Sequence, residues 1–231
     1  MSNEAGSLRR ALLGAHRAAL SFLFPDSCLA CGVALSGDER HICSACRRAV
    51  VARPGVVRLP RESPVERVCY SLEFDGPVRA LVRALKYDGR TSAARDLAAA
   101  ALPLAREVAA GSVDLVVPVP LHSTRRRERG FNQAELIAVS MARGLGLPTL
   151  PGLSRTRATS SQVDLTGAAR LANVSGAFAG GPALLGRRVL VVDDVVTTGA
   201  TLCEACAAAL RAGAERASGL AVAGRRLTET G

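Results

Sequence analysis

The sequence predicts an α/β fold with a mainly parallel sheet flanked by helices, preceded by a small cysteine-rich subdomain. Three observations support this. Apolar, β-branched stretches such as 113–119 and 188–192 are typical of strands buried on both faces. Stretches with helical spacing lie between them, and such alternation implies parallel strands joined by crossover helices. Two Cys-x-x-Cys pairs lie within residues 26–50.

The predicted elements follow one another closely after residue 63. Asn132 is a suitable N-terminal cap for a helix, and Gly111 and Gly213 are suitable C-terminal stops. In chain order we expect a strand at 65–74, helices at 77–85 and 91–111, a strand at 113–119, a helix at 132–143, a strand at 188–192, a helix at 201–212 and a strand at 217–223.

Composition divides the chain into four parts. Residues 1–25 are expected to form an amphipathic helix rather than a signal peptide, because charges interrupt them and no small-residue cleavage site follows. Residues 26–50 hold the cysteine pairs, 51–62 are predicted to be a linker rich in Pro and Arg, and 63–231 form the α/β domain. No apolar run reaches the roughly 18 residues of a membrane span. We therefore expect a cytoplasmic protein, of unassigned oligomeric state.

The net charge of +10 indicates an anionic partner but does not identify it. Lys86 is the only lysine, and the heavy use of arginine throughout is typical of a compositional bias. Aromatic residues make up 3% of the chain, so no stacking platform for single-stranded nucleic acid is visible. The basic excess suits a polyphosphate as well as DNA or RNA.

The two cysteine pairs are separated by eleven residues and predict a structural zinc site. The expected ligands are Cys28, Cys31, Cys43 and Cys46. Four thiolates complete a tetrahedron, and metal binding would supply the folding energy of a segment too short for its own core. The alternatives are a disulfide or redox pair, or His41 as a replacement ligand. Cys203 and Cys206 repeat the spacing inside a predicted helix, where small buried residues are the expected role.

Residues 189–201 combine an apolar strand, two acids and a turn that opens a helix. The turn consists of Thr197, Thr198, Gly199, Ala200 and Thr201. Ligands bind at the carboxyl ends of strands in open α/β sheets, where Asp193 and Asp194 could accept hydrogen bonds from ribose hydroxyls. Backbone N–H groups at a helix N-terminus favour a phosphate. The alternative is an ordinary strand–turn–helix. Neither a Walker A nor a dinucleotide fingerprint is present.

This segment resembles the ribose-phosphate fingerprint of the type I phosphoribosyltransferases. Other segments extend the resemblance: the cysteine pairs, Lys-Tyr-Asp-Gly at 86–89, Val-Pro-Val-Pro-Leu-His at 117–122, Arg-Gly-Phe-Asn-Gln-Ala-Glu at 129–135 and Asn-Val-Ser-Gly-Ala-Phe at 173–178. Together they are similar to the ComF family, the competence-protein and GntX-like group, over roughly residues 20–226.

The resemblance implies a zinc knuckle joined to a phosphoribosyltransferase domain that binds phosphoribosyl pyrophosphate (PRPP) or a related ribose-5-phosphate ligand. Asp193 and Asp194 would bind the ribose, with Mg²⁺ accompanying the diphosphate, and residues 197–201 would hold the 5-phosphate. Val119 and Pro120 would form the loop on the pyrophosphate side. The stretch 155–165 would supply the lid, with Arg155 and Gln162.

Three further polar features join these candidates. Lys86 is assigned to the site because it is the only lysine in a chain that otherwise uses arginine, and a compact ammonium is not interchangeable with guanidinium. Arg129 is the preferred member of the arginine run at 125–129, which is either a solvated charge run or a contact for pyrophosphate or nucleic acid. His122 has no visible acid or nucleophile partner.

Two functions remain open. The first is an enzyme that transfers the phosphoribosyl group by positioning and electrostatic stabilisation, although no acceptor pocket is visible. The second is a non-catalytic accessory protein of DNA uptake that contacts single-stranded DNA, with competence or helicase proteins as partners. Fold and motif alone do not establish catalysis.

Overall fold

A computed structural model describes residues 26–157 and 174–225 of the 231-residue chain. The chain forms two compact units, residues 1–49 and 50–231. The expected N-terminal helix at 1–25 and the lid residue Gln162 lie outside the described residues. No helix among the described residues is long and apolar enough to cross a membrane.

The described part of the first unit is a pair of tight turns and one short helix, α2 (Ser44–Arg48). Cys43 caps α2 by accepting the N–H of Cys46, and the Glu39 carboxylate accepts the N–H of Ser44. No residue of α2 is buried. Local hydrogen bonds therefore shape this segment, with no apolar core contributed by its helix.

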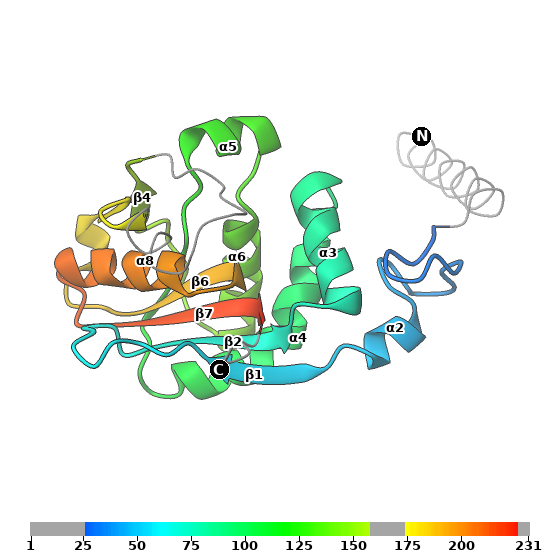
Figure 1. Ribbon diagram of the computed structural model, residues 1–231, viewed down its shortest axis with the longest axis horizontal. Helices are drawn as coiled ribbons and strands as arrows, with labels where there is room; N and C mark the ends of the chain where they lie inside the picture. Colours follow the sequence, from blue (N-terminus) through cyan, green and yellow to red (C-terminus); the bar gives the residue numbers. More distant parts are fainter. Residues whose placement is uncertain (1–25, 158–173, 226–231) are drawn as a thin grey trace, which may run out of the picture. The chain divides into compact units, whose positions relative to one another are not determined.

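The second unit is built on a five-stranded sheet (Figure 1). The strands are β1 (Ala52–Val56), β2 (Arg67–Glu73), β3 (Leu115–Pro118), β6 (Arg188–Val196) and β7 (Arg216–Gly224). Their order across the sheet is β1-β2-β7-β6-β3, and β1 alone is antiparallel to its neighbour. The mainly parallel α/β sheet expected from the sequence is thereby confirmed.

Helices cover both faces of this sheet. Strand residues alternate in direction, so Val189 and Val191 join the cluster that includes Leu202 and Cys206 of α8 (Ala200–Arg211). The opposite face is covered by α4 (Ala93–Ala109) and α6 (Gln133–Leu145), which pack on each other and on the sheet. The remaining elements are α3 (Gly76–Tyr87), α5 (Ser123–Arg129), the hairpin of β4 (Leu153–Arg155) and β5 (Phe178–Gly180), and the 3₁₀ turn η1 (Pro182–Leu184).

Two segments differ from expectation. The expected linker at 51–62 contributes β1, an edge strand that pairs with β2 through an irregular register. Its Pro54 and Gly55 obscured the strand pattern, but an edge strand tolerates a proline because one side needs no ladder partner. The arginine run at 125–129 lies in a short helix, α5, that ends at Gly130 with φ +80°.

Strand β6 is longer than expected and runs to Val196. Asp193 and Asp194 therefore lie within the part of β6 that pairs with β7, rather than in a loop beyond the strand. Regular strand geometry then fixes the directions of both carboxylates.

Candidate functional site

The two adjacent acids of β6 point to opposite faces of the sheet, because neighbouring strand residues alternate. Asp193 follows the direction of Val191, toward the α8 face, and Asp194 follows Val192, toward α6. Both are buried, with exposed fractions of 9% for Asp193 and 3% for Asp194. One pair of residues thus presents a carboxylate to each side of the sheet edge.

Asp194 is held by residues from α3 and α6. Lys86 Nζ lies 2.5 Å from Asp194 Oδ2, and Gln133 Nε2 donates to Asp194 Oδ1 at 3.5 Å. Arg129 in turn donates to Gln133 Oε1 at 2.5 Å. The Arg129 guanidinium also lies over the Tyr87 ring, 5.6 Å from its centroid. The site therefore joins three distant sequence segments through one carboxylate.

Lys86 remains a cation in this setting. Burial lowers the pKa of Lys86, but the charge of Asp194 and its hydrogen bond outweigh burial, so the pKa lies above its ordinary value. Lys86 lies in the last turn of α3, which brings its side chain beside the end of β6.

The surroundings of Asp193 oppose ionisation of its carboxyl group. Its Oδ1 accepts the N–H of Asp194 at 2.8 Å, but burial and then the charge of Asp194 raise the pKa of Asp193 well above its ordinary value. Arg155 is close enough for its charge to couple to Asp193, although burial and the charge of Arg125 lower the pKa of Arg155. A bound cation or hydroxyl donors would favour the ionised form of Asp193.

The turn after β6 is shaped for close approach of the backbone. Gly199 has φ +83° and is the cap residue of α8, with no side-chain cap bond. A Cβ added at Gly199 would lie 2.5 Å from Val57 Cγ1, so glycine is required both by conformation and by contact. Thr197 is exposed and Thr198 is half-buried, with Thr198 Oγ1 accepting the N–H of Ala200 at 3.5 Å. Backbone and hydroxyl donors thus gather at the start of α8.

The loop after β3 is fixed at its base. The N–H of Val119 donates to Val192 O, and Asn132 Nδ2 donates to Val119 O, both at 2.9 Å. Asn132 also caps α6 by accepting the N–H of Ala134. The half-buried Pro120 follows, so the predicted pyrophosphate-side loop starts beside β6.

A cavity of about 590 Å³ adjoins the Lys86–Asp194 pair. It is lined by Lys86, Tyr87, Gly89, Arg125, Glu128, Arg129 and Phe131. Arg125 and Arg129 lie one helical turn apart on α5 and both line it, whereas Arg126 pairs with Glu135 at 3.4 Å. The arginine run is therefore divided between a cavity wall and solvent.

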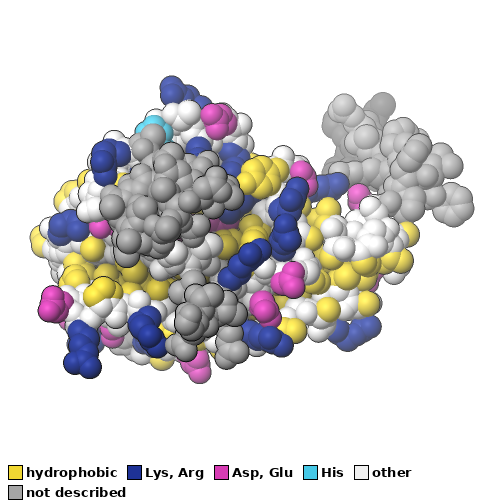
Figure 2. Space-filling model, in the orientation of Figure 1, with side chains coloured by type: hydrophobic (Ala, Val, Ile, Leu, Met, Phe, Trp, Pro, Cys, Tyr) yellow, Lys and Arg dark blue, Asp and Glu magenta, His cyan; other side chains and the backbone are white. Residues whose placement is uncertain are grey.

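Basic side chains are spread out on one face of the molecule. On the face drawn in Figure 2, Lys and Arg side chains are dispersed among acidic and apolar ones rather than gathered in one patch. The cavity beside Lys86, by contrast, brings Lys86, Arg125 and Arg129 together.

The four predicted metal ligands converge within the first unit. The Sγ atoms of Cys28, Cys31, Cys43 and Cys46 all lie within 4.8 Å of one another, and those of Cys31 and Cys43 are 3.7 Å apart. A tetrahedral zinc site with bonds of about 2.3 Å has sulfur–sulfur edges of about 3.8 Å. The cluster can therefore hold a metal such as zinc.

Backbone donors support thiolates in this cluster. Burial opposes ionisation of Cys28, but N–H groups of Cys43, Cys31 and Ala30 outweigh it and lower the pKa of Cys28 to about 6. Contact with Cys31 and burial raise the pKa of Cys46 to about 12. Four adjacent sulfurs cannot all ionise without a cation, which fits a metal ligand set.

The other Cys-x-x-Cys pair, in α8, has a different role. Cys206 is fully buried in the sheet core, and burial raises its pKa well above the ordinary thiol value. Cys203 is half-buried, and burial also raises its pKa. Among the described residues, only the first-unit cysteines form a group with metal-ligand spacing.

Two residues of the candidate site, Gln133 and Tyr87, were not assigned to it from the sequence. Gln133 links Arg129 to Asp194, and Tyr87 supports the Arg129 guanidinium. Both belong to motifs that carry the family resemblance, but their partners are distant in sequence. His122 caps α5, its Nδ1 accepting the N–H of Thr124 at 3.4 Å, which is a structural role.

Comparison with known proteins finds a matching family and several relatives. Residues 97–229 match the Phosphoribosyl transferase domain family. The DNA utilization protein YhgH of Salmonella typhi is 33% identical over 211 residues, covering 82% of this chain and 93% of that protein. Competence protein F of Haemophilus influenzae is 38% identical over 95 residues, covering 39% of this chain and 42% of that protein. Glutamine PRPP amidotransferase from B. subtilis aligns with a TM-score of 0.39 at 24% identity, over 56% of this chain and 26% of its own.

The fold and the matched family define a protein built around a phosphoribosyl transferase domain. Within that class, the chain belongs to the ComF-like family, to which its relatives with competence and DNA utilization names point. The resemblance inferred from the sequence motifs is thus confirmed.

Proposed function

We propose that the chain binds PRPP, or a closely related ribose-5-phosphate diphosphate, together with Mg²⁺ at the carboxyl edge of β3 and β6. The observation that carries the proposal is the link from Arg129 through Gln133 to Asp194 and Lys86. This link supports the proposal, because cations that suit a diphosphate lie beside carboxylates that suit a ribose, near a turn whose N–H and hydroxyl groups suit a phosphate.

Each part of the ligand has a matching group. Asp193 and Asp194 accept hydrogen bonds from the ribose hydroxyls, and the turn 197–201 donates to the 5-phosphate. The diphosphate lies toward Lys86, Arg129 and the loop of Val119 and Pro120. Arg155 ends β4, where the stretch expected to supply the lid begins, and the other expected lid residue, Gln162, lies outside the described residues.

The carboxylates also suit Mg²⁺, which is usually held by one or two carboxylates plus substrate phosphates. Asp193 is the better candidate ligand, because its carboxyl group is not paired with Lys86 and a bound cation would offset the burial and the Asp194 charge that raise its pKa. Bound Mg²⁺ would neutralise charge on the diphosphate. Lys86 and Arg129 would add to this by stabilising the diphosphate as it leaves, so transfer needs positioning and charge rather than a covalent nucleophile.

Thermal unfolding in the presence of PRPP and Mg²⁺ tests the proposal. Ligand at 100 times its Kd should add about 2.7 kcal/mol to the free energy of unfolding. Asp193→Asn combined with Asp194→Asn should abolish the shift. Arg211→Gln, which removes an exposed ion pair with Glu204 on α8, is the matched control and should keep it. An equal shift in the double variant would contradict the assignment.

A DNA-related role is a second candidate, suggested by the names of the relatives, which concern DNA utilization and competence. The exposed side of α5, with Arg126 and Arg127, offers the phosphate contacts that single-stranded DNA would need. Ligand binding and DNA contact use different sides of this helix, so they can be tested separately.

A further inference from the structure

Gln133 is a buried amide at the first position of α6, where it is 5% exposed. The preceding Asn132 fixes the backbone there in two ways, because it caps α6 and also donates to Val119 O at 2.9 Å. The residues that line the cavity beside Lys86 do not include Gln133. A ligand in that cavity therefore acts on Gln133 through other side chains rather than by contact.

The Gln133 amide fits its two partners in one orientation. A guanidinium can only donate hydrogen bonds and an ionised carboxylate can only accept them, whereas an amide has one end of each kind. Gln133 Oε1 accepts from Arg129, and Gln133 Nε2 donates to Asp194. Turning the amide over would set donor against donor at one end and acceptor against acceptor at the other. Gln133 is thus matched to a cation on one side and a carboxylate on the other.

The contacts of this amide belong to a closed ring of side chains, the Gln133 ring. Lys86 pairs with Asp194, and Asp194 accepts from Gln133. Arg129 donates to Gln133, and its guanidinium lies over Tyr87. Lys86 and Tyr87 are neighbours in the last turn of α3, which closes the ring. Its members come from α3, α5, α6 and β6, so the ring holds the ends of four elements together.

The Gln133 ring joins the two halves of the proposed ligand site. Lys86, Tyr87 and Arg129 line the cavity proposed for the diphosphate, whereas Asp194 is one of the two acids proposed for the ribose. The contact between Gln133 and Asp194, at 3.5 Å, is the longest hydrogen bond in the ring. Hydrogen bonds of functional sites are often long in ligand-free proteins and tighten in the complex. The ring is consequently loosest where the two halves of the site meet.

We propose that Gln133 is a positioning residue that makes the diphosphate and the ribose of PRPP bind cooperatively. The inference rests on the proposed function. A diphosphate that accepts from Arg129 restrains the guanidinium, and the Gln133 amide passes this restraint to Asp194. The carboxylate is then already ordered when the ribose reaches it, so the second contact costs less conformational entropy. The coupling belongs to the whole ligand, since either half alone needs only one side of the ring.

Binding of PRPP, inorganic pyrophosphate and ribose 5-phosphate tests the coupling. Each is titrated with Mg²⁺ into the full chain by saturation-transfer NMR, which detects weak binding. Gln133→Met keeps the length of the side chain but removes both hydrogen bonds. It should weaken PRPP binding by about tenfold, because both lost hydrogen bonds involve charged groups. Pyrophosphate and ribose 5-phosphate should each keep their affinity, whereas a purely structural role of Gln133 would weaken all three ligands alike.

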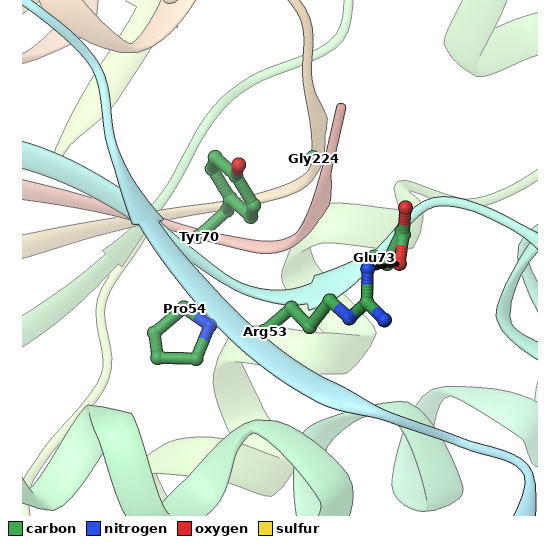
Figure 3. A pocket seen from close by; sticks show the side chains of 5 residues that line it. All are labelled: Arg53, Pro54, Tyr70, Glu73 and Gly224. Atoms are coloured by element: carbon green, nitrogen blue, oxygen red, sulfur yellow. Dashed lines mark ion pairs between the residues drawn. The ribbon is translucent and has the colours of Figure 1, made fainter. Parts of the chain in front are cut away.

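Gln133→Asn tests the span of the amide. It keeps a donor and an acceptor but is one methylene shorter, so it cannot reach Arg129 and Asp194 together. It should lose PRPP affinity as Gln133→Met does, and it decides the matter if Gln133→Met does not fold. Glu73→Gln is the matched control and should change none of the affinities. It breaks the exposed ion pair with Arg53 at a separate cavity of about 240 Å³, which no member of the Gln133 ring lines (Figure 3).

The outcomes separate the coupling from the proposed function. If the unsubstituted chain binds PRPP, the coupling is overturned by unchanged PRPP affinity in both Gln133 variants, or by an equal loss for all three ligands. Failure of both variants to fold would assign Gln133 to the stability of the fold and would overturn the coupling as well. If the unsubstituted chain does not bind PRPP, the proposed function is overturned and the coupling with it.

Discussion

Lys86 Nζ lies 2.5 Å from Asp194 Oδ2, and this ion pair joins the last turn of α3 to the end of β6. The side chains are 21% and 5% exposed, so solvent screens the pair weakly. The one lysine of the chain therefore occupies a place where a compact ammonium reaches a buried carboxylate, while arginine serves elsewhere.

Lys86→Met should destabilise the fold by about 3 kcal/mol, because removing one partner of a buried pair leaves an uncompensated charge. Urea unfolding measures the loss. Lys86→Arg keeps the charge and should lose less. The pKa of Lys86 is raised, so its contribution is complete below the ordinary lysine value and is lost as pH rises through the folded value. Equal stability of Lys86→Met and the unsubstituted chain would show that the pair is not formed.

Asp193→Asn should stabilise the ligand-free protein at neutral pH while abolishing its PRPP-dependent shift. Burial and the charge of Asp194 raise the pKa of Asp193, so its ionisation costs stability as pH rises from its ordinary value of 3.8 through the folded value. The amide lacks this cost. We expect a gain of about 1 kcal/mol, the usual size for such sites. The gain should fade in acid; a gain that is constant from acid to neutral pH would contradict the explanation.

The sequence identified the parts of the site that depend on local pattern. The two acids, the Thr-Gly turn and the four cysteines are close in sequence, so their spacing carries the information. The opposite directions of Asp193 and Asp194 followed only once β6 was known to extend to Val196. Gln133 was part of a recognised motif, but its role depends on Asp194, a distant partner.

The edge strand β1 was missed for a related reason. Its sequence, Ala-Arg-Pro-Gly-Val, has weak strand propensity, and pairing with β2 and the Tyr70 contact at Gly55 make it a strand. The ion pair of Arg53 and Glu73 could not be predicted either, since these side chains meet only when β1 and β2 pair. Tertiary pairing, not local preference, determines this part of the sheet.

Gly199→Ala should destabilise the protein for two separable reasons. The φ of +83° disfavours a side chain by about 1 kcal/mol, and the added Cβ would lie 2.5 Å from Val57 Cγ1. Gly186→Ala is the matched control, because Gly186 has φ +65° with nothing within 4 Å of an added Cβ. Its loss should be the smaller, and Val57→Ala should recover part of the Gly199→Ala loss. Equal losses at both glycines would rule out the contact with Val57.

The purified protein should contain about one zinc ion per chain, measured by elemental analysis. Cys28→Ser combined with Cys43→Ser removes half of the ligand set and should release the metal. Cys203→Ser combined with Cys206→Ser is the control with identical spacing and should retain it, since Cys206 lies in the core. Metal lost only from the α8 variant would move the site there.

Single-stranded DNA should bind through the exposed side of α5 if the second candidate function holds. Arg126 and Arg127 are exposed there, whereas Arg125 and Arg129 line the cavity. Each lost phosphate contact lowers the slope of log K against log salt by about 0.7 for a single strand, so Arg126→Gln with Arg127→Gln should lower it by about 1.4. Fluorescence anisotropy with a labelled oligothymidine at several KCl concentrations measures the slope. Arg211→Gln with Arg216→Gln removes the same charge from other ion pairs and should change it less. If both double variants lower the slope equally, the binding comes from diffuse net charge, and α5 has no specific part in it.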